Sequence, residues 1–96
     1  MDPTVWGPHY WFVFHTYADA YPEKPNTIIR SSAISFIKCI PFILPCGECA
    51  KHAFSYIESF APYLEIIVSS RDNLITFFRN FHDSVNKRLN KKVYFY

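Results

Sequence analysis

Two cysteines separated by two residues have the clearest chemical potential in the sequence. Cys46 and Cys49 stand in the segment Pro45-Cys46-Gly47-Glu48-Cys49, and this spacing allows the two sulfurs to form a disulfide. Pro45 is typical of a helix's first turn, so the pair is predicted at the start of a helix over 45–59. Unpaired amide N–H groups and the helix dipole stabilise a thiolate there. The pair is therefore predicted to carry out thiol–disulfide chemistry.

The same two cysteines could instead contribute to a zinc site. Cys46, Cys49 and His52 stand at positions i, i+3 and i+6, and His15 or His82 would supply a fourth ligand. An isolated CxxC is often half of a zinc site. A non-catalytic zinc-binding or interaction module therefore remains the alternative to redox chemistry.

The residues around the pair exclude two other cysteine functions. Attachment of a c-type haem requires histidine directly after the second cysteine, and residue 50 is alanine. A thioredoxin-like motif requires a βαβ context, which this sequence does not offer. The third cysteine, Cys39, is predicted to be a buried small hydrophobic residue on the apolar side of a helix.

Hydrophobic residues recur at helical spacing along most of the chain, which predicts an all-α fold. The first helix is predicted over 10–20. The others are expected from a cap at Asn26 or Thr27 to Pro41, over 45–59, and from a cap at Ser70 or Asp72 to Leu89, where Lys91 and Lys92 complement the helix dipole. The segment 63–68 is β-prone but lacks a partner strand, so we expect a connection there. Four helices with short loops form a bundle.

Length and charge limit the classes of function. The 96 residues are expected to form one domain, 1–96. A net charge of +2 is too balanced to favour a nucleic-acid partner. No segment approaches the roughly 20 apolar residues of a membrane span, and Met1-Asp2-Pro3 lacks the features of a secretory signal. We therefore expect an intracellular protein without a membrane span.

A polar stripe and an aromatic pair are candidates for ligand binding. His82, Asn86 and Asn90 recur every four residues, and each side chain can both donate and accept hydrogen bonds. Trp11 and His15 place a flat ring beside a donor. Taken alone, the stripe is more typical of a solvated helix face and the pair of a core. An aromatic content of 20% nevertheless suits a planar ligand.

Together these segments resemble the Erv/ALR family of flavin-linked sulfhydryl oxidases, and its short viral members most. The matching elements occur in the family's order and spacing over about nine-tenths of the chain. They are Trp6-Gly7-Pro8, Trp11, His15-Thr16, Tyr21-Pro22, the CxxC segment, and the run Phe81-His82-Asp83-Ser84-Val85-Asn86-Lys87-Arg88-Leu89-Asn90-Lys91.

The resemblance implies a four-helix bundle that holds FAD at one end, usually as a head-to-tail homodimer, with a short additional segment. It assigns Cys49 to the flavin side and Cys46 to exchange with substrate. It also assigns a cofactor-binding set: Gly7, with Trp11 and His15 beside the isoalloxazine, and His82, Asn86, Asn90 and Lys91 at the adenosine and phosphates.

The resemblance further implies a thiol oxidase that passes electrons from dithiol substrates through the CxxC pair and FAD to oxygen, giving hydrogen peroxide. The sequence ends at Tyr96, without the later cysteine pair of the family and without a second CxxC. Electrons are therefore expected from a separate dithiol protein or a thioredoxin-like shuttle. If the protein is viral, as the resemblance suggests, it is expected in the host cytoplasm or the virion.

Overall fold

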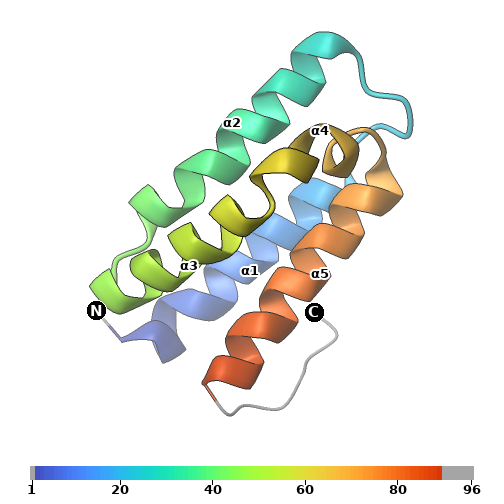
Figure 1. Ribbon diagram of the computed structural model, residues 1–96. Helices are drawn as coiled ribbons and strands as arrows, with labels where there is room; N and C mark the ends of the chain where they lie inside the picture. Colours follow the sequence, from blue (N-terminus) through green and yellow to red (C-terminus); the bar gives the residue numbers. More distant parts are fainter. Residues whose placement is uncertain (1, 90–96) are drawn as a thin grey trace.

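The computed structural model describes residues 2–89, which are helical and contain no β-strand. Its elements are the long helices α1 (Pro3–Asp19), α2 (Thr27–Ile43), α3 (Gly47–Ser59) and α5 (Arg71–Arg88), with the 3₁₀ helix η1 (Ala61–Tyr63) and the short helix α4 (Leu64–Ile67) before α5. The predicted all-α four-helix bundle is confirmed (Figure 1). The described residues also contain two short helical elements, η1 and α4.

Side chains at the caps explain where the long helices begin. The Asp2 carboxylate accepts a hydrogen bond from the Thr4 N–H at 2.9 Å, and the Asn26 side chain accepts one from Ile29 at 2.8 Å. Ser70 caps α5 in the same way through Asn73. Each cap satisfies an amide that the helix itself leaves unpaired.

Two predicted helix starts and one predicted connection are wrong. Helix α1 begins at Pro3 rather than near Tyr10, because proline is favoured in a first turn and Pro8 is tolerated within the helix. Helix α3 begins at Gly47, so Pro45 precedes the N-cap and does not occupy the first turn.

The segment 63–68 is helical, because Leu64 and Val68, four residues apart, are both buried in the core. Tertiary burial outweighs β propensity there.

The helices pack in two pairs. Helix α2 lies mainly against α3, and α1 lies mainly against α5 (Figure 1). The most completely buried side chains of the core are Ile37, Ile40, Val68, Leu74 and Phe78. Phe14 joins the pairs, since its ring stacks on Phe78 and meets Phe36 edge-on. The bundle measures 37 × 23 × 19 Å.

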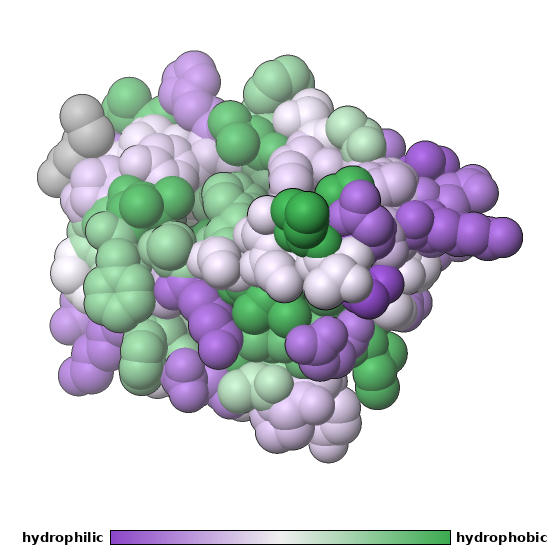
Figure 2. All heavy atoms as spheres, turned by 90° about the horizontal axis from the view of Figure 1, so that it is seen from above, coloured by the Kyte–Doolittle hydropathy of each residue, from purple (hydrophilic) through white to green (hydrophobic). Residues whose placement is uncertain are grey.

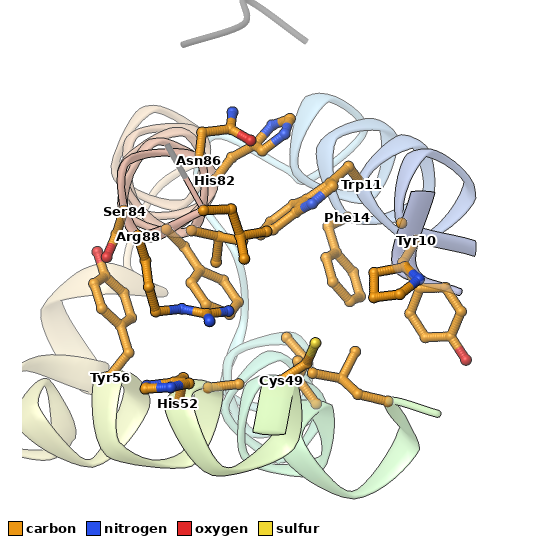
Figure 3. A pocket seen from close by; sticks show the side chains of 18 of the residues that line it. Tyr10, Trp11, Phe14, Cys49, His52, Tyr56, His82, Ser84, Asn86 and Arg88 are labelled. Atoms are coloured by element: carbon orange, nitrogen blue, oxygen red, sulfur yellow. The ribbon is translucent and has the colours of Figure 1, made fainter. Parts of the chain in front are cut away.

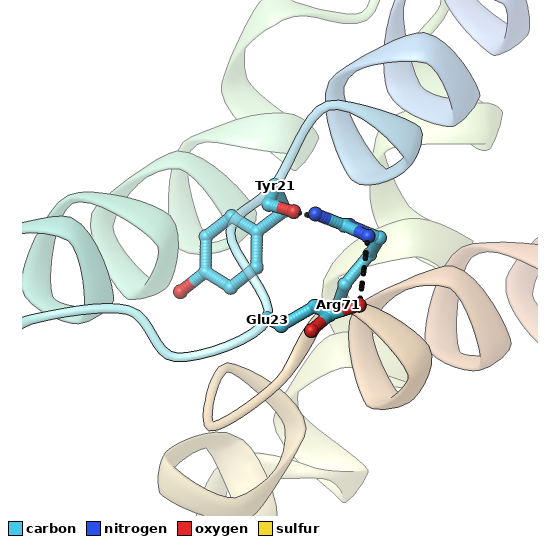
Figure 4. A network of polar contacts seen from close by, with 3 residues as sticks. All are labelled: Tyr21, Glu23 and Arg71. Carbon is cyan, nitrogen blue, oxygen red and sulfur yellow. Dashed lines mark hydrogen bonds and ion pairs between the residues drawn. The ribbon is translucent and has the colours of Figure 1, made fainter.

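A polar network closes the end of the bundle that carries the loop between α1 and α2. The Arg71 guanidinium donates to the Tyr21 carbonyl and pairs with Glu23 at 3.4 Å (Figure 4). The Tyr21 hydroxyl donates to the Val68 carbonyl at 2.7 Å. These bonds tie the loop between α1 and α2 to the start of α5 and to the end of α4.

Cys39 is exposed on α2, so the prediction of a buried residue is wrong. The core side of α2 is formed by Ala33, Ile37 and Ile40, and Cys39 lies on its other side.

The surface is mixed. Seen from above, hydrophobic side chains reach it in small groups between hydrophilic ones (Figure 2). No helix within residues 2–89 is both long and apolar enough to cross a membrane.

Candidate functional site

Helices α1, α3 and α5 enclose a cavity of about 870 Å³ (Figure 3). Aromatic rings form much of its lining: Trp6, Tyr10, Trp11 and Phe14 from α1, Tyr56 from α3 and Phe81 from α5. Polar groups are few, and they include Cys49, His52, His82, Asn86 and Arg88. This size and this balance of apolar and polar groups are typical of a site for an organic ligand.

The start of α3 presents the two cysteines differently. Cys46 is the N-cap of the helix, and its Sγ accepts a hydrogen bond from the Cys49 N–H at 3.3 Å. Cys49 lies one turn further on and lines the cavity, whereas Cys46 is half-buried and is not part of the lining. The prediction that both cysteines stand at the start of a helix is confirmed.

Their surroundings shift the two thiols in opposite directions. The hydrogen bond from the Cys49 thiol, followed by those from backbone N–H groups, lowers the pKa of Cys46. Burial raises the pKa of Cys49, and the hydrogen bond to Cys46 and the charge of Cys46 raise it further. In the reduced pair, Cys46 is therefore the more acidic of the two thiols.

A buried pair of histidines stands across the cavity from Cys49, and of the two only His82 is among the lining residues (Figure 3). His15 of α1 and His82 of α5 are 3% and 7% exposed, and His15 Nε2 lies 3.0 Å from His82 Nδ1. The Trp11 indole stacks on His82 with ring centroids 4.2 Å apart and planes 12° apart. Burial, followed by the charge of His82, lowers the pKa of His15 to about 4. His15 is therefore neutral at pH 7.

Asn86 lies one turn beyond His82 and is 4% exposed. Within residues 2–89, its Nδ2 has no hydrogen-bond partner. A buried amide without a partner is costly, so this group fits an acceptor on a bound ligand. Asn86 and His82 are thus not on a solvated helix face, which was the expectation from their spacing alone.

Two of the predicted cofactor residues, Asn90 and Lys91, lie outside the described residues. Gly7 lines the cavity, and a methyl group added there would meet no protein atom within 4 Å. The described protein therefore does not itself require glycine at position 7.

The zinc alternative lacks support. Among residues 2–89, no group of three or more His, Cys, Asp or Glu side chains is placed to hold a metal ion. His52 instead pairs with Glu48 on its own helix at 3.8 Å, and His15 pairs with His82. The ligands that sequence spacing suggested are thus divided between two sides of the cavity.

The structure adds lining residues that sequence reasoning did not select for this role. On α3, Cys49, His52, Ala53 and Tyr56 follow the i, i+3, i+4, i+7 pattern of one helix face. Arg88 of α5 is seven residues after Phe81 and reaches into the cavity toward Cys49 (Figure 3). Helical spacing from Cys49 and from Phe81 could have identified these lining residues in the sequence. It is informative only once Cys49 and Phe81 are known to line the same cavity.

A family model described as Erv1 / Alr family matches residues 8–95. The chain belongs to this family. It is 49% identical, over 97% of its length, to protein 347L of Invertebrate iridescent virus 6, and covers 86% of that protein. It is 35% identical over 92% of its length to the FAD-linked sulfhydryl oxidase of African swine fever virus (isolate Pig/Kenya/KEN-50/1950), and covers 71% of it.

Solved structures of yeast Erv1 are similar to this Erv1 / Alr family member. The yeast Erv1 core superposes with a TM-score of 0.88 at 30% identity, with 99% of this chain and 77% of the other covered. The FAD binding domain of Erv1 from Saccharomyces cerevisiae gives 0.88 at 32% identity, with 98% and 86% covered. The family resemblance and the fold predicted from sequence are both confirmed.

Proposed function

We propose that this chain is a single-domain, FAD-dependent thiol oxidase that forms disulfide bonds in dithiol substrates. The observation that supports this most directly is the position of Cys49. Its sulfur belongs to a reactive cysteine pair and also lines an aromatic cavity of about 870 Å³. The names of the viral relative and of the yeast FAD binding domain agree with this function.

The residues of the cavity fit FAD. Trp11 and His15 would lie beside the flavin ring, Gly7 would also bind the cofactor, and His82 and Asn86 would hold the adenosine portion, with Asn90 and Lys91 further along the chain. The Asn86 Nδ2, buried without a partner among residues 2–89, supports this assignment because a ligand acceptor would satisfy it. When bound, FAD accepts two electrons from the cysteine pair and passes them to oxygen, which yields hydrogen peroxide.

The chain's own residues carry out the exchange with substrate. A substrate thiolate attacks Cys46 Sγ, the Cys46–Cys49 bond breaks, and Cys49 leaves as a thiolate. A second substrate thiolate then attacks the substrate sulfur of the mixed disulfide and releases Cys46 with the oxidised product. Attack falls on Cys46 because Cys49 lies in the cavity. Two electrons then reside on the cysteine pair.

The substrate is a dithiol, and we propose that it belongs to a separate dithiol protein or a thioredoxin-like shuttle. We also propose a homodimer. Large apolar side chains are exposed on α1 and α2, among them Val13 (53%) and Ile28 (76%), and a second copy would cover them. The viral relatives support a place in the host cytoplasm or the virion.

Purified protein tests the function directly. It should be yellow, retain FAD through gel filtration, and consume oxygen when given a small dithiol. A colourless preparation with stoichiometric zinc would overturn the proposal. Light scattering on the same preparation measures whether the mass is that of one chain or two.

A further inference from the structure

Breaking the Cys46–Cys49 disulfide places a negative charge in an unfavourable location. When a substrate thiolate bonds to Cys46, the electron pair of the broken bond goes to Cys49 Sγ. Burial raises the pKa of this thiol, so its surroundings disfavour the charge. A leaving sulfur departs faster when its thiolate is better stabilised. Exchange at Cys46 therefore benefits from a positive charge close to Cys49.

Arg88 is placed to supply that charge. It stands in the last turn of α5, lines the same cavity as Cys49, and extends across the cavity toward α3 (Figure 3). Its charge and its hydrogen bond oppose the other influences and lower the pKa of Cys49. No carboxylate oxygen within residues 2–89 lies within 4.0 Å of the guanidinium, so the charge is not neutralised there.

The other ionisable groups around this space do not replace Arg88. They are Tyr10 from α1, Cys46, His52 and Tyr56 from α3, and His82 from α5. Neither the tyrosines nor Cys46 can carry a positive charge. His52 pairs with the Glu48 carboxylate, and His82 pairs with His15.

We propose that the Arg88 guanidinium stabilises the Cys49 thiolate that forms when a substrate thiolate opens the disulfide, and that it thereby directs attack to Cys46. The inference rests on the proposed thiol oxidase function and adds a residue to it. The step is balanced: one S–S bond forms at Cys46, one breaks, and the negative charge passes from the substrate sulfur to Cys49.

The test measures the acidity of Cys49 in FAD-loaded, full-length protein. The background is Cys39→Ser with Cys46→Ser, which leaves Cys49 as the only thiol. Into it go Arg88→Gln, which removes the charge, Arg88→Lys, which keeps it, and Lys87→Gln. Lys87 is the matched control, since it is the neighbouring exposed cation of α5 and does not line the cavity. Two readouts are followed against pH: the long-wavelength band of a thiolate lying against flavin, and the rate of Cys49 alkylation by iodoacetamide.

In both readouts, Arg88→Gln should raise the midpoint by about one pH unit, as expected for loss of a nearby opposite charge. Arg88→Lys should recover most of that shift, and Lys87→Gln should leave the midpoint in place. Equal midpoints for Arg88→Gln and Lys87→Gln would overturn the inference. If Arg88→Gln releases FAD, the alkylation profile still decides, and Arg88→Lys separates lost charge from lost structure.

Failure of the underlying function would look different. A background protein with Arg88 intact that binds no FAD, or shows no long-wavelength band at any pH, contradicts the proposed function. A band that is present and titrates independently of Arg88 contradicts only the role of Arg88.

Discussion

One side of the cavity comes from a single stretch of chain, whereas the opposite side is assembled across 67 residues. Cys46 and Cys49 share one turn at the start of α3 and are joined by a local hydrogen bond. His15 and His82 lie on different helices and meet only because α1 packs against α5. The first arrangement depends on local sequence, and the second depends on the folded core.

This difference separates the residues proposed to exchange disulfides from the residues proposed to bind the cofactor. The two cysteines are brought together by one turn of α3, and more distant groups act on the acidity of Cys49, through its burial and Arg88. The His15–His82 pair, by contrast, joins two helices that are packed through core residues such as Phe14, Phe78 and Phe81. We therefore expect substitutions on the cysteine side to affect turnover, and those on the histidine side to affect cofactor retention and stability.

The largest expected effect comes from the cysteine pair. Cys46→Ser and Cys49→Ser should each abolish turnover with dithiol substrates, because neither leaves a disulfide to exchange. Removal of Cys46 leaves Cys49 beside the flavin, so a long-wavelength thiolate–flavin band should appear. Removal of Cys49 should give no such band. Visible spectra of the two variants measure this, and a band that follows Cys49→Ser would reverse the assignment of the two sulfurs.

On the histidine side, His15 should make stability dependent on pH. Its pKa is about 4 in the folded protein, below the ordinary value of about 6.5, so the unfolded chain takes up the proton first. The free energy of unfolding is therefore not reduced by His15 above pH 6.5, and it falls as the pH is lowered from 6.5 toward 4. The size of this fall is up to about 3 kcal/mol.

Urea unfolding of FAD-free protein between pH 7 and pH 4 measures this dependence. His15→Gln should weaken the pH dependence relative to wild type, whatever its stability at pH 7. The matched control is His9→Gln, since His9 is exposed on the same helix. Equal slopes for wild type and His15→Gln would show that the histidine pair does not resist protonation.

Sequence alone was sufficient to place the two cysteines at the start of a helix, although not to find the lining residues beside Cys49. The CxxC spacing and the nearby proline placed both sulfurs at a helix start, because a helix N-terminus is determined by residues close in the chain. The same kind of argument gave two candidates for each of two other caps, Asn26 or Thr27 and Ser70 or Asp72, and the first of each pair is the observed cap. It failed at the start of the first helix, which was predicted near Tyr10 from hydrophobic spacing although α1 begins at Pro3 and includes Pro8.

The histidine side could not be derived from spacing. A row of His82 and Asn86 every four residues has the pattern of a solvated face, and only the packing of α1 against α5 buries it. The family resemblance selected these residues, and spacing did not. Cys39 shows the opposite error, since a lone cysteine in an apolar helix suggests a core position although the residue is exposed. Burial is a property of the assembled bundle, so a single helix pattern does not fix it.

A smaller effect is expected at Asn86, where the cofactor and the protein have different requirements. In FAD-free protein, Asn86→Leu should leave the melting temperature unchanged or raise it, because it removes a buried amide that lacks a partner among residues 2–89. With FAD, the same change should cost on the order of 1–3 kcal/mol, or one to two decades in affinity. Melting temperatures without and with excess FAD measure the effect on the protein alone and the effect on cofactor binding.

His82→Ala is the comparison for Asn86→Leu. It breaks the hydrogen bond to His15 and the stack on Trp11, so it should lower stability in FAD-free protein as well. Added FAD should recover part of that loss by mass action. If Asn86→Leu and His82→Ala both retain wild-type FAD affinity, the adenosine portion binds elsewhere.

The smallest effect is expected at Cys39, which tests whether the third cysteine belongs to either side of the cavity. The residue is exposed on α2 and does not line the cavity, so Cys39→Ala should change the free energy of unfolding by no more than about 0.5 kcal/mol. Turnover with a small dithiol should also be retained. Ile37→Ala is the matched contrast on the same helix, because Ile37 is fully buried and its truncation should cost about 2–5 kcal/mol. Urea unfolding and oxygen consumption of both variants give the comparison. A loss of turnover in Cys39→Ala without a loss of stability would mean that Cys39 takes part in electron transfer, contrary to its position outside the cavity.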